Sequence, residues 1–298
     1  MSKTMSKTMS KAMSKQWLAI LLCSALPWLG ACQAGGETSS TVPSADGVPI
    51  RFETTGMGDP ALVFIHGWNC DRGYWRAQLD HFSNTHRVVA IDLAGHGQSG
   101  DGRSEWSMGA FGEDVAAVVR ALELDHVVLV GHSLGGPVSI EATRILGDSV
   151  KLVVGADTLN DVSQGFPEDQ LAGMLAALEA DFPGTVAGLV RSSFFVPESD
   201  PALVDWITND MAAAPPAAGI GAFAAYGYWF NEEAGSALAA VRAPIRLINS
   251  DYRPTNITAG QAVSRSFEVS EMSGVGHFVM MEDPDTFNQL LTDLVEDL

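Results

Sequence analysis

The stretch HVVLVGHSLGGPVSIEATRIL, residues 126–146, decides the fold. It opens with the apolar, mostly β-branched run VVLV, which is typical of a buried strand, and closes with apolar residues at helical spacing. The pattern G-x-S-x-G lies between them, with Ser133 at its centre. That pattern is weak alone, because 30 of the 298 residues are glycine. A strand directly before it and a helix directly after it indicate a sharp turn that exposes the hydroxyl. Ser133 is therefore predicted to be a nucleophile rather than a polar residue of a glycine-rich turn.

Strand-like and helix-like segments alternate through the rest of the chain. Apolar, β-branched runs bounded by turn residues predict strands at 49–55, 61–66, 87–92, 126–131, 151–157, 244–250 and 267–272. Apolar residues on one helical face predict helices at 73–83, 107–124 and 134–146, and a last helix capped by Asp283 or Asp285. This alternation predicts an α/β fold with a mostly parallel central sheet flanked by helices.

One segment, 158–241, interrupts this alternation. It contains no convincing strand, it is rich in alanine, and its helix-like pieces are separated by Pro and Gly. We expect a helical cap inserted between two strands of the sheet. The cap carries several aromatic residues, most of which are expected to form its own core: Phe194, Phe195, Trp206, Phe223, Tyr226, Tyr228, Trp229 and Phe230.

The N-terminal residues 1–31 have the pattern of an export signal. Four lysines and no acidic residue precede a short apolar stretch, which is below the roughly 20 residues needed to span a bilayer. The sequence LGAC at 29–32 resembles the lipobox of bacterial lipoproteins, which implies a lipid anchor on Cys32 at the cell envelope, facing the periplasm or in the outer membrane if the cell is Gram-negative. The alternative is an ordinary secretory signal that is cut nearby. Small polar residues at 32–47 predict a flexible tether, and 48–298 the folded domain.

Charge and cysteine content limit the partners. The chain carries 36 acidic and 17 basic residues, a formal net charge of −19, which argues against nucleic acid as a partner.

Cys70 is the one cysteine left in the domain, so no internal disulfide forms if Cys32 is acylated. Its thiol is either a reactive group or, as we expect, a small buried filler. No Cys/His spacing fits zinc, and no metal or cofactor is expected.

Four motifs, in this order along the chain, resemble those of the α/β-hydrolase superfamily: HGW (66–68), DLAGHGQS (92–99), GHSLGG (131–136) and GVGHFVMMEDP (274–284). The resemblance covers the chain from about residue 48 onward. It implies an α/β-hydrolase fold in which the cap is inserted between strands 6 and 7.

The resemblance also implies residue roles. His277 is the expected base, and the backbone N–H groups of Trp68 and Leu134 are the expected oxyanion hole. The acid is either Asp157, at the end of the strand 151–157, or Asp251, in the loop NSDYRPTN. Both stay open, with a preference for Asp157, because Arg253 stands where the family usually has its aspartate.

A serine, a histidine base and an oxyanion hole perform acyl transfer. The aromatic cap carries few charges, so the expected substrates are small to medium hydrophobic carboxylic esters, and the expected class is a carboxylesterase. Alternatives are an amidase or peptidase, a perhydrolase or a C–C hydrolase of the same fold, or a binding protein without catalysis. The sequence leaves the oligomeric state open.

Overall fold

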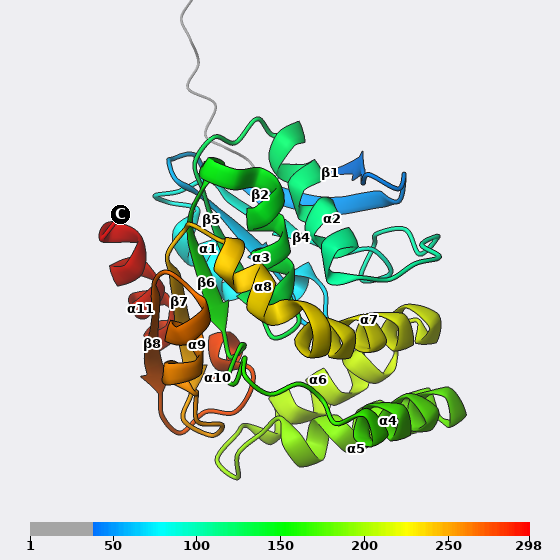
Figure 1. Ribbon diagram of the computed structural model, residues 1–298. Helices are drawn as coiled ribbons and strands as arrows, with labels where there is room; N and C mark the ends of the chain where they lie inside the picture. Colours follow the sequence, from blue (N-terminus) through cyan, green and yellow to red (C-terminus); the bar gives the residue numbers. More distant parts are fainter. Residues whose placement is uncertain (1–37) are drawn as a thin grey trace, which may run out of the picture. The chain divides into compact units, whose positions relative to one another are not determined.

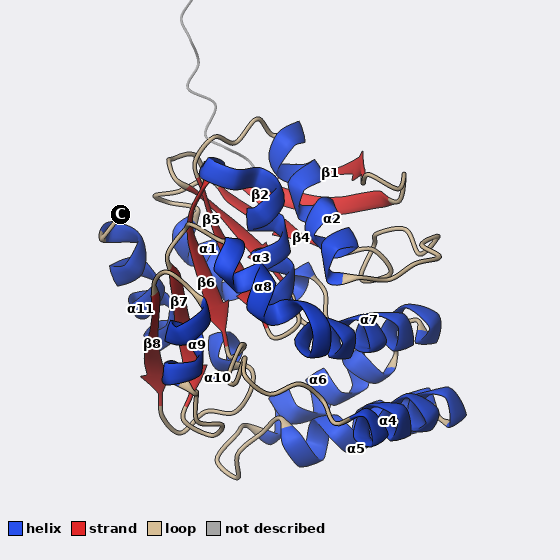
Figure 2. Ribbon diagram, in the orientation of Figure 1, coloured by secondary structure: helices blue, strands red, loops and turns tan. Residues whose placement is uncertain are grey.

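The structure is a computed structural model that describes residues 38–298; the predicted signal sequence and Cys32 lie outside these residues. Figures 1 and 2 show a central sheet with helices packed around it. Its strands have the order β1-β2-β4-β3-β5-β6-β7-β8. β2 pairs antiparallel with both β1 and β4, and the other neighbours are parallel. The strands are β1 (Thr38–Pro43), β2 (Pro49–Thr55), β3 (Ala61–Ile65), β4 (Val88–Ile91), β5 (Val127–His132), β6 (Val150–Ala156), β7 (Ile245–Ser250) and β8 (Phe267–Met272).

The predicted α/β-hydrolase architecture is confirmed. Seven of the strands agree with the expected ranges to within a residue at each end. The predicted body helices at 73–83, 107–124 and 134–146 are present, although the second ends at Ala121. Asp283 is the residue that caps the last helix, by accepting from the Thr286 N–H. The short helices Gly147–Ser149, Ile257–Val263 and Val279–Glu282 were not predicted. No described helix is long and apolar enough to cross a membrane. The body helices are η1 (Arg72–Trp75), α1 (Arg76–Phe82), α2 (Met108–Ala121), α3 (Gly135–Leu146), η2 (Gly147–Ser149), α9 (Ile257–Val263), α10 (Val279–Glu282) and α11 (Pro284–Glu296).

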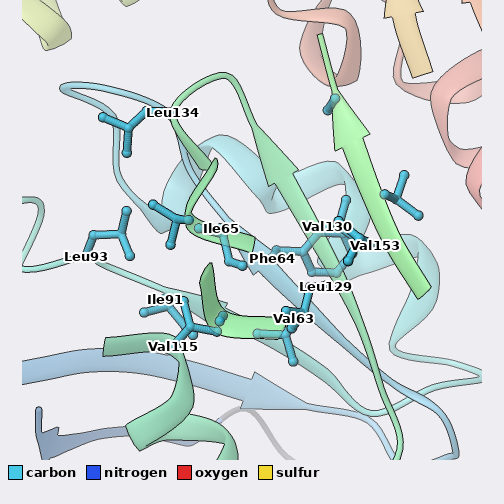
Figure 3. Packing of buried hydrophobic residues seen from close by; sticks show 14 of the residues in the cluster. Val63, Phe64, Ile65, Ile91, Leu93, Val115, Leu129, Val130, Leu134 and Val153 are labelled. Atoms are coloured by element: carbon cyan, nitrogen blue, oxygen red, sulfur yellow. The ribbon is translucent and has the colours of Figure 1, made fainter. Parts of the chain in front are cut away.

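The central strands are buried on both faces, because helices cover each face of the sheet. Every residue of β3, β4 and β5 is buried. Figure 3 shows how their side chains interleave: Val63, Phe64 and Ile65 of β3 lie among residues of β4, β5 and α2. Because side chains on both faces are buried, these strands are continuous apolar runs in the sequence and do not alternate between apolar and polar residues.

The predicted cap between β6 and β7 is confirmed. Its helices α4 to α7 group together beyond one end of the sheet (Figure 1). Prolines open two of them, at Pro201 and Pro216, where the missing N–H costs no hydrogen bond. The sequence predicted four helices here, and the structure adds a π-helical turn and α8. The cap elements are α4 (Glu168–Ala180), α5 (Phe182–Ser193), α6 (Pro201–Ala212), α7 (Pro216–Tyr228), η3 (Trp229–Glu233) and α8 (Ala234–Ala240).

The expectation of a flexible tether up to residue 47 is wrong for its second half. Residues 38–43 form β1, which pairs with residues 49–54 of β2. The turn that follows is fixed as well, because the Ser44 hydroxyl donates to Asp114 at 2.5 Å and Asp46 forms an ion pair with Arg103 at 2.7 Å. β1 is almost entirely exposed, so backbone pairing rather than apolar burial holds it in place. Its small polar side chains gave no hydrophobic pattern that could predict a strand.

Candidate active site

Ser133 stands at a strained turn between β5 and α3. Its φ is +51°, a left-handed conformation that costs a non-glycine residue energy and that is concentrated at functional sites. Neighbouring groups of β6 and the loop after it hold this turn: the Ser133 N–H donates to the Ala156 carbonyl at 3.1 Å, and Thr158 Oγ1 donates to the Ser133 carbonyl at 2.7 Å. The strand–turn–helix context that the sequence predicted is present.

Glycines make this turn sterically possible. A Cβ on Gly131 would lie 2.1 Å from the Gly135 carbonyl oxygen, and a Cβ on Gly135 would lie 2.5 Å from the Ile65 carbonyl oxygen. Both distances are far inside van der Waals contact. The two flanking glycines of G-x-S-x-G therefore let the start of α3 pack directly against the ends of β5 and β3.

His277 pairs with Asp157, one of the two candidate acids. His277 Nδ1 lies 2.5 Å from Asp157 Oδ2, and the other carboxylate oxygen, Oδ1, accepts the Ser250 N–H at 2.9 Å. Asp157 is only 3% exposed and has a φ of +43°, so the chain bends sharply where β6 ends. The carboxylate is therefore buried, held from two sides and aimed at the imidazole.

Asp251, the other candidate acid, lies apart from this pair. Its residue is exposed and is not among those that line the pocket described below. Its backbone N–H donates to the Met272 carbonyl at 2.9 Å, which continues the pairing of β7 with β8. The structure thus brings Asp157, and not Asp251, to His277.

The loop that carries His277 is fixed by residues that the sequence analysis did not single out. The His277 N–H donates to the Phe194 carbonyl of the cap at 2.7 Å, and the Gly276 N–H donates to Glu282 at 3.0 Å. His132 Nε2 donates to the His277 carbonyl at 3.0 Å. Burial lowers the pKa of His132 well below its usual range, so this imidazole is neutral and acts as a structural donor. No pattern in the sequence marks these contacts, since they join distant segments.

The two residues expected to form the oxyanion hole, Trp68 and Leu134, line the same cavity as Ser133. Neither the Trp68 N–H nor the Leu134 N–H has an acceptor among residues 38–298, although Trp68 is 6% and Leu134 1% exposed. Buried backbone donors are normally paired, so two such groups near a serine are available to a ligand oxygen. The HGW turn is held by His66, whose Nε2 accepts the Leu93 N–H at 3.0 Å and whose Nδ1 donates to the Gly67 carbonyl at 2.8 Å.

A cavity of about 250 Å³ joins these groups. Ser133, His277, Asp157, Trp68 and Leu134 all line it. Its other walls are largely apolar and come mainly from the cap, including Phe166, Met174, Leu189, Phe194, Met211 and Phe223. Part of the aromatic cap therefore faces the site. Trp229 instead connects the cap to the body, because its Nε1 donates to Glu141 of α3 at 2.8 Å.

The Trp68 side chain links the turn to the cap. Its indole Nε1 donates to the Gly219 carbonyl of α7 at 2.7 Å, and its ring lies 5.2 Å from that of Phe223. Cys70, two residues on, is 3% exposed, and burial raises the pKa of its thiol well above the usual value. A neutral buried thiol is a poor nucleophile, which agrees with the expected role as a filler.

No group of three or more potential metal ligands occurs in the part of the chain that the structure describes. That the reaction needs neither metal nor cofactor stays a prediction from the sequence. The Ser133 hydroxyl has no hydrogen-bond partner within residues 38–298, so it is available to react. Catalytic hydrogen bonds are often long or unformed before substrate binds.

Comparison with known proteins agrees with this geometry. The family model described as "Alpha/beta hydrolase family" matches residues 62–290. The chain is 26% identical to the "AB hydrolase superfamily protein YisY" of Bacillus subtilis (strain 168), over 84% of this chain and 96% of that protein. It is 31% identical to a "Non-heme chloroperoxidase" of Streptomyces lividans, over 58% of this chain and 69% of that protein. Among solved structures, a thermophilic esterase from Thermogutta terrifontis has a TM-score of 0.77 at 21% identity, covering 87% of this chain and 98% of the esterase.

Proposed function

The chain belongs to the alpha/beta hydrolase family, and from this premise we propose that it is a serine esterase that cleaves small to medium hydrophobic carboxylic esters through an acyl-enzyme on Ser133. One observation carries the proposal. A buried carboxylate holds the His277 imidazole by Nδ1, in the same cavity that exposes Ser133 at a strained turn. This arrangement supports the roles of nucleophile, base and orienting acid.

The proposed reaction begins with proton transfer. Because Nδ1 of His277 donates to Asp157, Nε2 is the nitrogen left to take the Ser133 proton. The serine oxygen then bonds to the ester carbonyl carbon, and the electron pair of the C=O bond moves to oxygen. The N–H groups of Trp68 and Leu134 stabilise that oxyanion. Collapse of the tetrahedral intermediate breaks the bond to the alcohol oxygen, which leaves with the proton from His277.

Water completes the cycle. His277 takes a proton from the water as its oxygen attacks the acyl-enzyme carbonyl, and a second tetrahedral intermediate forms. Its collapse returns the proton to Ser133 and releases the carboxylic acid. The Asp157 carboxylate stabilises the imidazolium that exists between these steps and keeps the ring in one orientation.

The cavity supports a small substrate. At about 250 Å³ it is below the roughly 300–1,000 Å³ of typical small-molecule sites. Its apolar walls would favour hydrocarbon chains through the hydrophobic effect. The cap supplies most of these walls, so the substrate enclosed there is shielded from water.

Replacement of Ser133 tests the proposal. The S133A protein should lose turnover of p-nitrophenyl acetate by at least about 10³-fold, because the nucleophile is gone while the fold is intact. The matched control is S236A, which removes an exposed hydroxyl bonded only to the Glu233 carbonyl of the cap. Undiminished turnover in S133A would refute the assignment.

A second activity, perhydrolysis, is favoured by one comparison. The Streptomyces lividans relative is named a chloroperoxidase, which suggests that peroxide acts in place of water at the same site. In this chain the peroxide oxygen would attack the same acyl-enzyme and release a peroxy acid. Peroxy-acid formation from acetate esters and hydrogen peroxide, lost in S133A, would demonstrate it.

We also propose that the protein is exported and anchored at the cell envelope by a lipid on Cys32. The support is the sequence alone: a basic start, a short apolar stretch and LGAC at 29–32. Wild-type protein from membranes should carry a diacylglyceryl group on Cys32 by mass spectrometry, and C32A should move to the aqueous fraction. Membrane retention of C32A without any lipid on the wild type would contradict the anchor.

A further inference from the structure

Arg253 brings a permanent positive charge to a cavity whose walls are largely apolar. It lies in the loop between β7 and α9 and lines the same cavity as Ser133 and His277. Among the lining residues it is the one arginine, and no lysine lines the cavity in the described part of the chain. The residue itself is exposed, so its side chain reaches the cavity from the side that meets solvent. Arg253 also occupies the loop position where the sequence motif would have placed an acid.

The Arg253 guanidinium has no carboxylate partner within residues 38–298. One nitrogen, Nη2, donates to the Ser193 carbonyl at the end of α5, at 2.8 Å. The N–H groups of Nε and Nη1 have no acceptor within residues 38–298, so they are available to a ligand. Asp157, the one acidic residue of the cavity lining, is already bonded to His277 and to the Ser250 N–H.

The backbone that presents Arg253 is held in place. The Asn160 side-chain amide donates to the Arg253 carbonyl at 3.0 Å, and the Asn256 N–H donates to the Asn160 carbonyl at 2.6 Å. These bonds tie the loop after β7 to the loop after β6, which also carries Asp157. The backbone of Arg253 is therefore fixed relative to the loop that carries Asp157, so that only the Arg253 side chain must be ordered when a ligand binds.

A second donor lines the same cavity. Tyr226 of α7 lines the cavity, and its hydroxyl has no hydrogen-bond partner among the described residues. Burial raises the pKa of Tyr226, and the positive charge of Arg253 opposes this rise, so the phenol is neutral. A phenol O–H and guanidinium N–H groups are both donors, and together they match the two oxygens of a carboxylate.

We propose that Arg253, assisted by the Tyr226 hydroxyl, binds a carboxylate on the substrate, so that the preferred substrates are half-esters of small dicarboxylic acids. The inference rests on the proposed ester hydrolysis and narrows its substrate class. The apolar walls hold the hydrocarbon spacer, Ser133 attacks the ester end, and Arg253 fixes the anionic end. The acidic surface repels anions in general, so Arg253 supplies the local attraction.

The test compares two esters of similar length, monoethyl glutarate and ethyl pentanoate, by the ethanol they release. Wild type should prefer monoethyl glutarate in kcat/KM. R253Q should lose about 10- to 100-fold toward the half-ester, the range expected for a hydrogen bond to a charged group. Toward ethyl pentanoate it should change by less than about 3-fold. The loss should fall on KM, because the carboxylate is bound equally in the ground and transition states.

Three further variants control the test. R242Q removes an exposed arginine that does not line the cavity, and it should behave as wild type. Y226F should lose about 2- to 10-fold toward the half-ester only, since a neutral hydrogen bond is lost. R253K keeps the charge and should retain part of the preference.

The outcomes separate this inference from the proposed function. Equal loss toward both esters in R253Q would show that Arg253 only positions α5 through Ser193, and would overturn the inference. A wild type that hydrolyses ethyl pentanoate without preferring the half-ester would overturn it as well, and would leave the esterase proposal intact. A wild type inert toward both esters would overturn the esterase proposal and the inference with it.

Discussion

At the scale of single residues, two strained positions shape the site. Ser133 and Asp157 both have positive φ, and each follows directly on the end of a strand. Such conformations persist only where surrounding bonds hold them. Here the Ser133 N–H is bonded to the carbonyl of Ala156, the residue before Asp157. The two bends therefore support each other, and they project the serine and the acid toward one cavity.

The choice between the two candidate acids gives a prediction at this scale. D157N should lower kcat by about 10³-fold or more, because the amide cannot stabilise the imidazolium and disturbs its orientation. D251N should stay within about 2-fold of wild type, since exposed side chains remote from a site have small effects.

Both variants keep the size of the side chain, so they control for each other, and circular dichroism should show the same fold. The measurement is single-substrate kinetics with p-nitrophenyl acetate. A large loss in D251N with little in D157N would assign the acid to the loop after β7 instead, and the bond between His277 and Asp157 would then be only structural.

At the scale of elements, the sequence predicted those parts that bury apolar side chains. β3 to β7 have apolar runs that match their burial, and the cap helices are bounded by Pro and Gly. β1 could not be predicted, because its stability comes from backbone pairing with β2 and from the turn at Ser44 and Asp46. α8 was missed since its short alanine-rich sequence, AGSALAA, has little periodicity.

The candidate site was predictable where a motif is local, and not where contacts join distant segments. Ser133 and its glycines form one continuous motif, so the turn could be predicted. The pairing of Asp157 with His277 spans 120 positions, and both candidate acids follow strands that end at the same edge of the sheet. Only the fold distinguishes them, through the bend at Asp157 and the Ser250 N–H. The same holds for Arg253 and Tyr226, which come from the body and the cap.

At the scale of the whole molecule, the order of the parallel strands assembles the site. β5, β6, β7 and β8 are neighbours in the sheet, and their carboxyl ends lie at one edge. The loops after them carry Ser133, Asp157, Arg253 and His277. The cap closes over this edge and supplies the apolar walls. Substrate sites in such sheets form outside the carboxyl ends of the strands, which is the position found here.

Buried histidines predict how stability depends on pH. Burial lowers the pKa of His66 to about 4 and of His96 to about 3, and it lowers the pKa of His132 as well. Above about pH 6.5 these groups are neutral in both the folded and the unfolded state and have no effect. Below it the unfolded chain binds more protons, so the free energy of unfolding falls by up to about 1.4 kcal/mol per pH unit for each histidine. Stability should therefore drop steeply between about pH 6.5 and pH 4.

Urea unfolding at several pH values measures this slope. H81Q removes an exposed histidine and should leave the slope unchanged, whereas H96Q should reduce it by about one proton. A flat profile from pH 7 to pH 5 would show that the buried imidazoles are protonated, or exposed to water, in the folded protein.

The assignment of Ser133 as the nucleophile can be tested by intact-mass spectrometry of the protein after reaction with a fluorophosphonate. This experiment identifies the reactive residue without assuming a substrate. We predict one added phosphonyl group, mapped to Ser133 in the peptide that contains GHSLGG, and no addition in S133A. If the wild-type protein is folded by circular dichroism but stays unmodified, or if the label is on any other residue, Ser133 is not the nucleophile.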